Sequence, residues 1–335
     1  MPRTLLHKNK PVAVVIALVV AVVMRFGNFF MPVPASPNPG PLYALFHTEL
    51  WGPAILTCAA LAVSALCALL LDVILSKFNL LGTISGYPVF FFAVFASLHP
   101  AMGSLSPALA ALPFILLGIW AFMVNFGRKH GQLSALASGM AFAVASLLYS
   151  PFLILLPFGI TALAVLKPAK WREFAAQLIG FGLPYGIFYS VMYLAGRPFA
   201  PYPTPGYADM PAFFGGFTSS WGFWLAAGVC FALLNLSLFT TLNTYNTYKI
   251  ITRRFFTIVV LLPAFLVPAS ALPPLPDTDV WWPVAIPFAA LAARFFLDIR
   301  RPAFARLILA LLFLTALLAR FDYYFGGAFT FKLVN

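Results

Sequence analysis

The dominant hydropathy pattern of the chain is a pair of apolar hairpins between Ser85 and Leu166. Each hairpin rises through apolar residues to a polar tip and then descends through more of them. We place the tips at His99–Pro107 and Tyr149–Pro151, and a basic segment, Arg128–His130, separates the two hairpins. Several limbs hold only about 15 to 18 residues, which is marginal for a hydrocarbon core of ~30 Å. We therefore expect neighbouring helices to surround these short limbs at the centre of a larger bundle.

Apolar segments on both sides of the hairpins extend the bundle to about eleven spans. Runs of this length predict helices, because the strands of a membrane barrel would alternate polar and apolar residues with period two. Beyond the hairpin limbs, the predicted spans are 11–30, 50–75, 175–195, 221–242, 255–271, 280–296 and 307–320. The predicted fold class is an all-α, polytopic transmembrane helical bundle.

The composition points to the same class of protein. The 335 residues are 62% hydrophobic and 8% charged, with a mean hydropathy of +0.96. Soluble domains carry roughly 25% charged residues, so this chain could not cover a water-facing surface of its size. The net charge of +12 would suit nucleic acid. The cations instead lie in the turns between spans, so no nucleic-acid partner is predicted.

The positions of the cations predict an orientation in the membrane. Cytoplasmic loops of membrane proteins carry an excess of Lys and Arg. With the N-terminus in the cytoplasm, most of the 20 Lys and Arg residues fall on the inner side. The basic start and the apolar run behind it are interpreted as an uncleaved first span, because no small-residue cleavage site precedes a soluble domain. An odd number of spans then places the C-terminus outside.

Polar residues predicted on the outer side are the candidates for chemistry. Charged side chains inside a membrane are costly and usually face a cavity or a partner. Arg25, Arg197 and Arg320 fall at one outer level, and three guanidinium groups there would suit a phosphate group. Asn28 follows Arg25 closely, and Asp322 follows Arg320 and is a possible partner for it. The alternative is that each arginine snorkels to lipid headgroups at the interface.

A second set of candidates lies in the outer loops and at the hairpin tips. Glu49 is an outer carboxylate with His47 nearby, so it could act as a general base. It could equally be an acid at the start of a helix, where the helix dipole stabilises a negative charge. His99 and Tyr149, at the two tips, are candidate substrate-binding residues, and His99 could also be an ordinary interfacial residue.

The sequence predicts neither a cofactor nor a metal. It contains no Walker loop, HExxH or GxSxG motif, and no intramembrane His or Glu cluster suggests a haem or a proton relay. The three cysteines lie inside apolar runs without metal or disulfide spacing. We interpret them as small apolar packing residues.

The two hairpins and the basic turn between them resemble the front module of polytopic glycosyltransferases of the GT-C type. The resemblance covers about residues 11–195. It implies that sugars are taken from polyprenyl-phosphate donors on the outer side of the membrane. GT-C enzymes usually place an acid, often a pair, in the first outer loop, and Glu49 is the acid available here. No carboxylate stands between the third and fourth spans, so the acidic motif is incomplete.

The chain also resembles a family of polytopic bacterial inner-membrane proteins whose domain has no known function. The matching stretches are Arg25–Phe30, Asn79–Gly82, Ser104–Pro107 and Lys170–Glu173. This resemblance implies the bacterial inner membrane. The orientation predicted from the cations then makes the N-terminus cytoplasmic and the C-terminus periplasmic.

Two hypotheses about function follow from the sequence. The first is a membrane protein that binds a polyprenyl-phosphate-linked sugar or similar envelope lipid on its outer side, with or without transferase activity. The second is a non-enzymatic component, such as a lipid or precursor transporter or an assembly subunit with a membrane-protein partner. In either case we expect a GT-C-like module over residues 1–195, an outer aromatic loop over 196–220 and a C-terminal block over 221–335.

Overall fold

The computed structural model describes residues 10–30, 39–83, 85–98, 103–125, 131–166, 170–196, 221–270, 278–299 and 302–324. These residues form eleven α-helices and several short 3₁₀ helices, and the described ranges contain no β-strand. The α-helices are α2 Lys10–Met24, α3 Pro53–Lys77, α4 Tyr87–Ala96, α5 Pro107–Asn125, α6 Gln132–Leu148, α7 Leu155–Leu166, α8 Trp171–Leu194, α10 Trp221–Asn243, α11 Ile250–Ser270, α12 Ala285–Asp298 and α13 Pro302–Tyr324.

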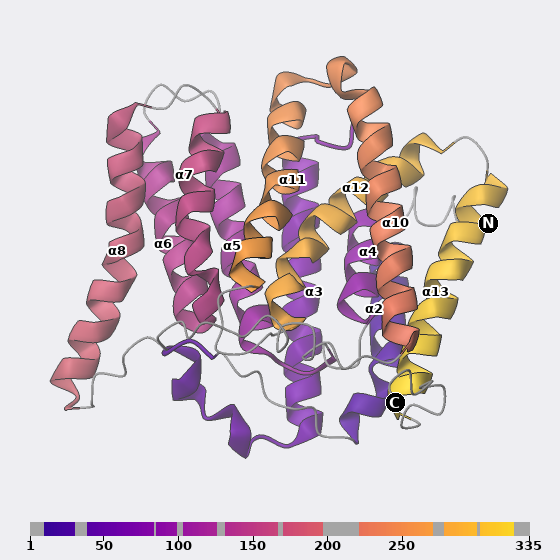
Figure 1. Cartoon of the computed structure of the whole chain (residues 1–335), viewed down its shortest axis with the longest axis horizontal. Helices are drawn as coiled ribbons and strands as arrows, with labels where there is room; N and C mark the ends of the chain where they lie inside the picture. The colour runs from indigo at the N-terminus through magenta and orange to yellow at the C-terminus, as the bar shows by residue number, and fades with distance from the viewer. Residues whose placement is uncertain are drawn as a thin grey trace, which may run out of the picture.

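The helices form one bundle in which successive helices run up and down (Figure 1). The end of α13 lies toward the lower end of this view. The helix ends agree with the first predicted hairpin tip, since α4 ends at Ala96 and α5 begins at Pro107, while residues 99–102 lie outside the described part of the chain. At the second tip, α6 ends at Leu148 and the 3₁₀ helix η5, Ser150–Ile154, follows.

Helix α4 is the short central element of the bundle. Its ten residues span about 15 Å, only half of a ~30 Å hydrocarbon core. Every residue of α4 except Phe90 is buried, which is expected for a helix that is apolar on all sides. Helices α2, α3 and α12 pack around it. The prediction that neighbouring helices surround the short limbs is therefore confirmed for α4.

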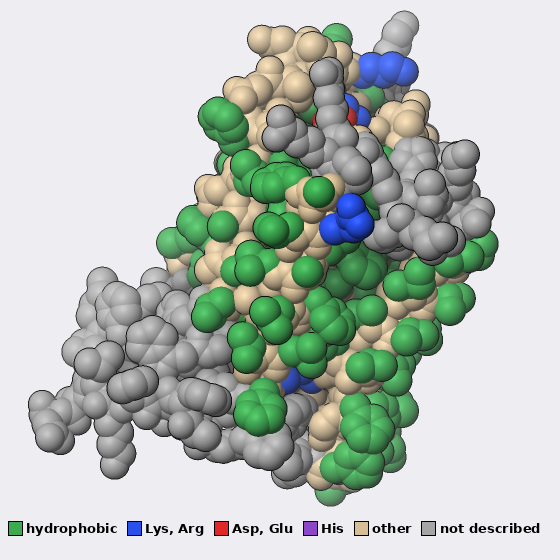
Figure 2. Space-filling view, turned by 90° about the vertical axis from the view of Figure 1, so that its right-hand side faces the viewer, with side chains coloured by type: hydrophobic (Ala, Val, Ile, Leu, Met, Phe, Trp, Pro, Cys, Tyr) green, Lys and Arg blue, Asp and Glu red, His purple; other side chains and the backbone are tan. Residues whose placement is uncertain are grey.

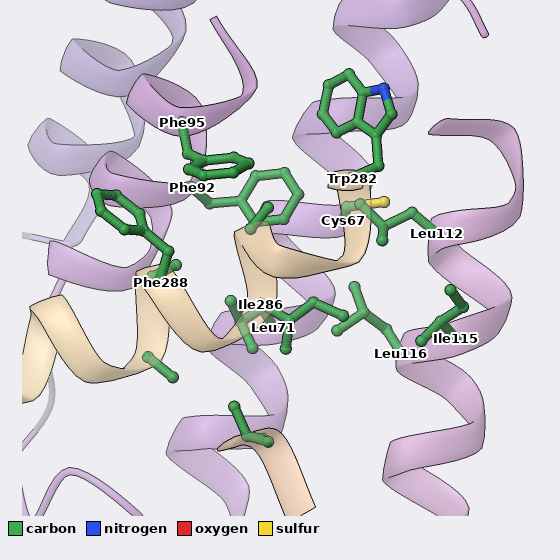
Figure 3. Close-up of a cluster of buried hydrophobic side chains, with 14 of the residues drawn as sticks. Cys67, Leu71, Phe92, Phe95, Leu112, Ile115, Leu116, Trp282, Ile286 and Phe288 are labelled. Carbon is green, nitrogen blue, oxygen red and sulfur yellow. The ribbon is translucent and has the colours of Figure 1, made fainter. Parts of the chain in front are cut away.

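Large side chains fill the space between α4 and its neighbours. Figure 3 shows Phe95 of α4 beside Phe288 of α12, while Phe92 of α4 lies on the side nearer Cys67 of α3. The ring centroids of Phe95 and Phe288 lie 5.2 Å apart. Aromatic pairs at this separation stabilise a core by about 0.5–1.5 kcal/mol beyond the apolar area that they bury.

Small residues bring α6 and α8 into close contact at the left of Figure 1. A Cβ atom on Gly180 of α8 would lie 2.3 Å from the carbonyl oxygen of Leu136, and one on Gly139 of α6 would lie 2.3 Å from that of Gln177. In lipid, helices associate largely through this kind of backbone approach at small residues. The opposite face of α8 is free of such contacts, since a Cβ on Gly182 would meet nothing within 4 Å.

The exterior of the bundle is apolar. Seven helices are long and apolar enough to cross a membrane, and four shorter apolar helices accompany them among the described residues. Figure 2 shows a face on which hydrophobic side chains dominate and Lys and Arg side chains are few. The predicted class, an all-α multi-pass membrane protein, is thereby confirmed. The bacterial inner membrane and the orientation of the termini stay predictions.

Helices that precede residues 196–220 in the sequence contact helices that follow them. Helix α12 packs on α4, and α11 packs on α7. Arg294 Nη1 of α12 donates to the carbonyl oxygen of Leu81 at 2.8 Å, and Arg254 Nη1 of α11 donates to that of Val165 at 2.6 Å. The proposed division into an N-terminal module and a C-terminal block stays a prediction.

Gly180→Ala should destabilise the protein by about 1–3 kcal/mol, because the new methyl group would overlap the backbone of α6. Gly182→Ala, two residues away on the open face, should leave stability unchanged or raise it by up to about 1 kcal/mol. Thermal unfolding of the purified protein in detergent measures both. Equal midpoints for the two variants would contradict the close approach of α6 and α8.

Candidate functional site

The candidate site lies where α4 ends inside the bundle. The last carbonyl groups of an α-helix have no partner within the helix and need donors from elsewhere. Arg25 Nη2 donates to the carbonyl oxygen of Ala96 at 2.8 Å. Arg320 donates to the carbonyl oxygen of Ser97 twice, from Nε at 3.1 Å and from Nη2 at 2.9 Å. Two guanidinium groups thus cap the C-terminal end of α4.

Arg25 reaches this position because α2 ends at Met24 and the chain turns into the 3₁₀ helix η1, Phe26–Phe29. The Arg25 side chain is fully buried. Its Nη1 donates to Ser64 Oγ of α3 at 3.1 Å. One guanidinium group therefore joins the end of α2, the middle of α3 and the end of α4.

Arg320 comes from the opposite end of the sequence, on α13, and is also buried. Its Nη1 donates to Asn28 Oδ1 at 3.3 Å. Asn28 is itself buried in η1, and its backbone carbonyl accepts from Thr57 Oγ1 of α3 at 3.1 Å. Gly103 lies against the Asn28 side chain, because a Cβ there would be 2.5 Å from Asn28 Nδ2. Asn28 therefore links η1 to α3 and α13.

The site carries positive charge at the negative end of a helix. A helix C-terminus corresponds to about −0.5 elementary charge, which offsets only part of two guanidinium charges. A guanidinium group has five N–H donors. Two described hydrogen bonds use Arg25 donors, and its buried Nε has no hydrogen-bond partner among the described residues. Arg25 thus retains capacity to donate to an additional acceptor such as an anion.

The structure brings together three of the predicted site residues: Arg25, Asn28 and Arg320. Tyr149 is buried at the second hairpin tip. Its ring centroid lies 4.7 Å from that of Phe152, and its backbone forms an isolated antiparallel β-bridge with Pro39.

The other predicted site residues are described in part or not at all. His47 is exposed at the turn before the 3₁₀ helix η3, Thr48–Leu50, with a left-handed backbone at φ 44°. Glu49 lies within η3 and Asp322 within α13, but their side chains lie outside the described part of the structure. His99 and Arg197 fall outside the described residues altogether.

The carbonyl oxygens of Ala96 and Ser97 and the hydroxyl of Ser64 are the part of the site that sequence reasoning missed. Backbone acceptors have no sequence signature. The one available signal was the shortness of the third predicted limb, because a helix that ends inside an apolar bundle needs donors there.

The described residues do not suggest a metal centre. They contain no group of three or more His, Cys, Asp or Glu side chains that could hold a metal ion. Cys67 and Cys230 are buried among apolar side chains, and Cys58 is exposed on α3. None of the three cysteines contributes to the arginine site.

No protein-family model matches the chain, and neither a curated protein nor a solved structure is detectably similar to it. The fold therefore defines the class of protein, a multi-pass helical membrane protein. The resemblance to GT-C enzymes and to the bacterial inner-membrane family stays a prediction.

Arg320→Gln should lower stability by about 2 kcal/mol, because hydrogen bonds from a charged donor each contribute about 1.5–3 kcal/mol and the Ser97 carbonyl would lose both of its own. Arg306→Gln, at an exposed position of the same helix, is the matched control and should change stability little. Thermal unfolding in detergent compares them. An Arg320→Gln protein as stable as the wild type would contradict the capping role.

Proposed function

We propose that this membrane protein binds the phosphate of a polyprenyl-phosphate-linked sugar or a similar envelope lipid at the end of α4. Arg25, Arg320 and Asn28 are the proposed binding residues. The observation that carries the proposal is the convergence of two buried guanidinium groups, contributed by helices far apart in the sequence, on one helix end. Buried cations in membrane proteins are costly and commonly mark substrate or ion sites.

The chemistry of the pair suits a phosphate group. Guanidinium groups bind phosphate oxygens through paired N–H donors, and the anion offsets their charge. Arg25 Nε is the donor available for this contact.

The depth of the pair suits a lipid headgroup. Arg320 lies four residues before the end of α13, which corresponds to about 6 Å along the helix axis. A phosphate at this level would lie just inside the bundle end, and the apolar exterior could accommodate a prenyl chain. The charge bias of the loops supports assigning this end of the bundle to the outer side.

A second candidate function is that of a non-enzymatic membrane component, such as an assembly subunit. The observation in its favour is that both guanidinium groups already bind carbonyl oxygens of the chain itself. In that case the pair only stabilises the end of α4, and no headgroup is required.

Binding of polyprenyl phosphate and of the matching uncharged polyprenol, measured on the detergent-purified protein by native mass spectrometry, separates these functions. We expect the phosphate to bind at least about ten-fold more tightly, because charged hydrogen bonds contribute about 1.5–3 kcal/mol each. Arg25→Gln should remove most of that preference, while Arg306→Gln should preserve it. Equal affinity of the wild type for both lipids would overturn the proposal.

Transferase activity is a separate step of the proposal, with Glu49 as the general base and His47 beside it in the loop. Glu49→Gln should lower the rate of sugar transfer from a polyprenyl-phosphate donor by about 100-fold or more, since general bases typically contribute 10²–10⁴-fold. The assay uses protein reconstituted in vesicles. Full activity in Glu49→Gln, with donor binding intact, would remove the catalytic role and leave lipid binding standing.

A further inference from the structure

A groove of about 470 Å³ runs between α5 and α6 on the surface of the bundle. Its walls are almost entirely apolar. Leu117 and Trp120 of α5 and Ala137 and Ala141 of α6 are among its lining residues. Leu117 and Ala137 are exposed, so the groove opens toward the surroundings of the protein rather than into the core.

The groove has the length of a lipid chain segment within one leaflet. It extends from Phe114 to Ala121 on α5 and from Ala137 to Val144 on the antiparallel α6. Either stretch rises about 10 Å at 1.5 Å per residue. One leaflet of a ~30 Å hydrocarbon core is about 15 Å deep, so the groove fits inside it.

A positively charged side chain, that of Lys77, lies at one end of this groove. Lys77 is the last residue of α3, and its Nζ lies 4.7 Å from the ring centroid of Trp120, which lines the groove. The lysine side chain is exposed, and the cation–π contact holds its ammonium group over the indole. An ammonium group has three N–H donors, so Lys77 can contact the ring and also bind an anion.

We propose that this groove binds one acyl chain of an anionic phospholipid such as phosphatidylglycerol, with the lipid phosphate on Lys77. The apolar walls suit the chain, and the charge of Lys77 at the groove end complements the phosphate. A groove without the cation would take neutral and anionic lipids alike. The position of Lys77 gives this site its preference for the anionic headgroup.

This lipid site is separate from the arginine site at the end of α4. Ser64, which binds Arg25, and Lys77 are both on α3, roughly 20 Å apart at 1.5 Å per residue. The arginine site therefore lies beside the middle of α3 and the groove cation at its C-terminal end, and loss of one site should leave the other intact.

The test is native mass spectrometry of the full-length protein released from vesicles of equal parts phosphatidylglycerol and phosphatidylcholine. We expect phosphatidylglycerol to be retained preferentially. Lys77→Gln should weaken that retention about five-fold, the effect of one cation near an anionic lipid. Ala141→Phe should weaken retention of the chain by filling the groove. Lys170→Gln, at an exposed position outside the groove, is the matched control and should retain phosphatidylglycerol as the wild type does.

Lys77→Arg keeps both the charge and the contact with Trp120, so it should retain phosphatidylglycerol as the wild type does. Thermal unfolding of each variant shows whether the bundle is intact. Retention of both lipids in equal amounts by the wild type would overturn the proposal. Unchanged phosphatidylglycerol retention in Lys77→Gln would do the same, because the preference would then come from another part of the protein.

Discussion

The fold depends on how the carbonyl groups at the end of α4 are satisfied. This helix stops after ten residues, inside the apolar bundle, where its last carbonyl groups need hydrogen-bond donors from the protein itself. An unsatisfied polar group in such a place costs several kcal/mol. Arg25 and Arg320 supply the donors, and in doing so they tie the end of α2 and the end of α13 to the centre of the bundle.

The same two arginines give the site its capacity to bind an anion. A neutral donor such as Ser or Asn could have capped α4, whereas two guanidinium groups concentrate charge and leave Arg25 Nε without an acceptor in the described structure. Structural capping and anion binding are thus compatible uses of one pair of residues. A phosphate-bearing lipid would complete the hydrogen bonding of Arg25 and offset the charge that the helix dipole leaves over.

Sequence reasoning found the elements because long apolar runs and their polar tips predict helices directly. It also placed Arg25 and Arg320, together with Arg197, at one outer level, since depth follows from helical rise. It could not show that Arg25, Asn28 and Arg320 meet, because they come from α2–η1 and α13, nearly 300 positions apart in the chain. Nor could it identify their acceptors at Ala96 and Ser97, since a backbone carbonyl looks the same at every residue.

The central claim is that two arginines cap a helix that ends inside the membrane, and an experimental structure of the protein in a lipid bilayer disc tests it most directly. The account predicts density that joins the guanidinium groups of Arg25 and Arg320 to the carbonyl oxygens of Ala96 and Ser97, below the surface of the bilayer. Guanidinium groups turned outward to the lipid headgroups, with the end of α4 bonded to other donors, would contradict it.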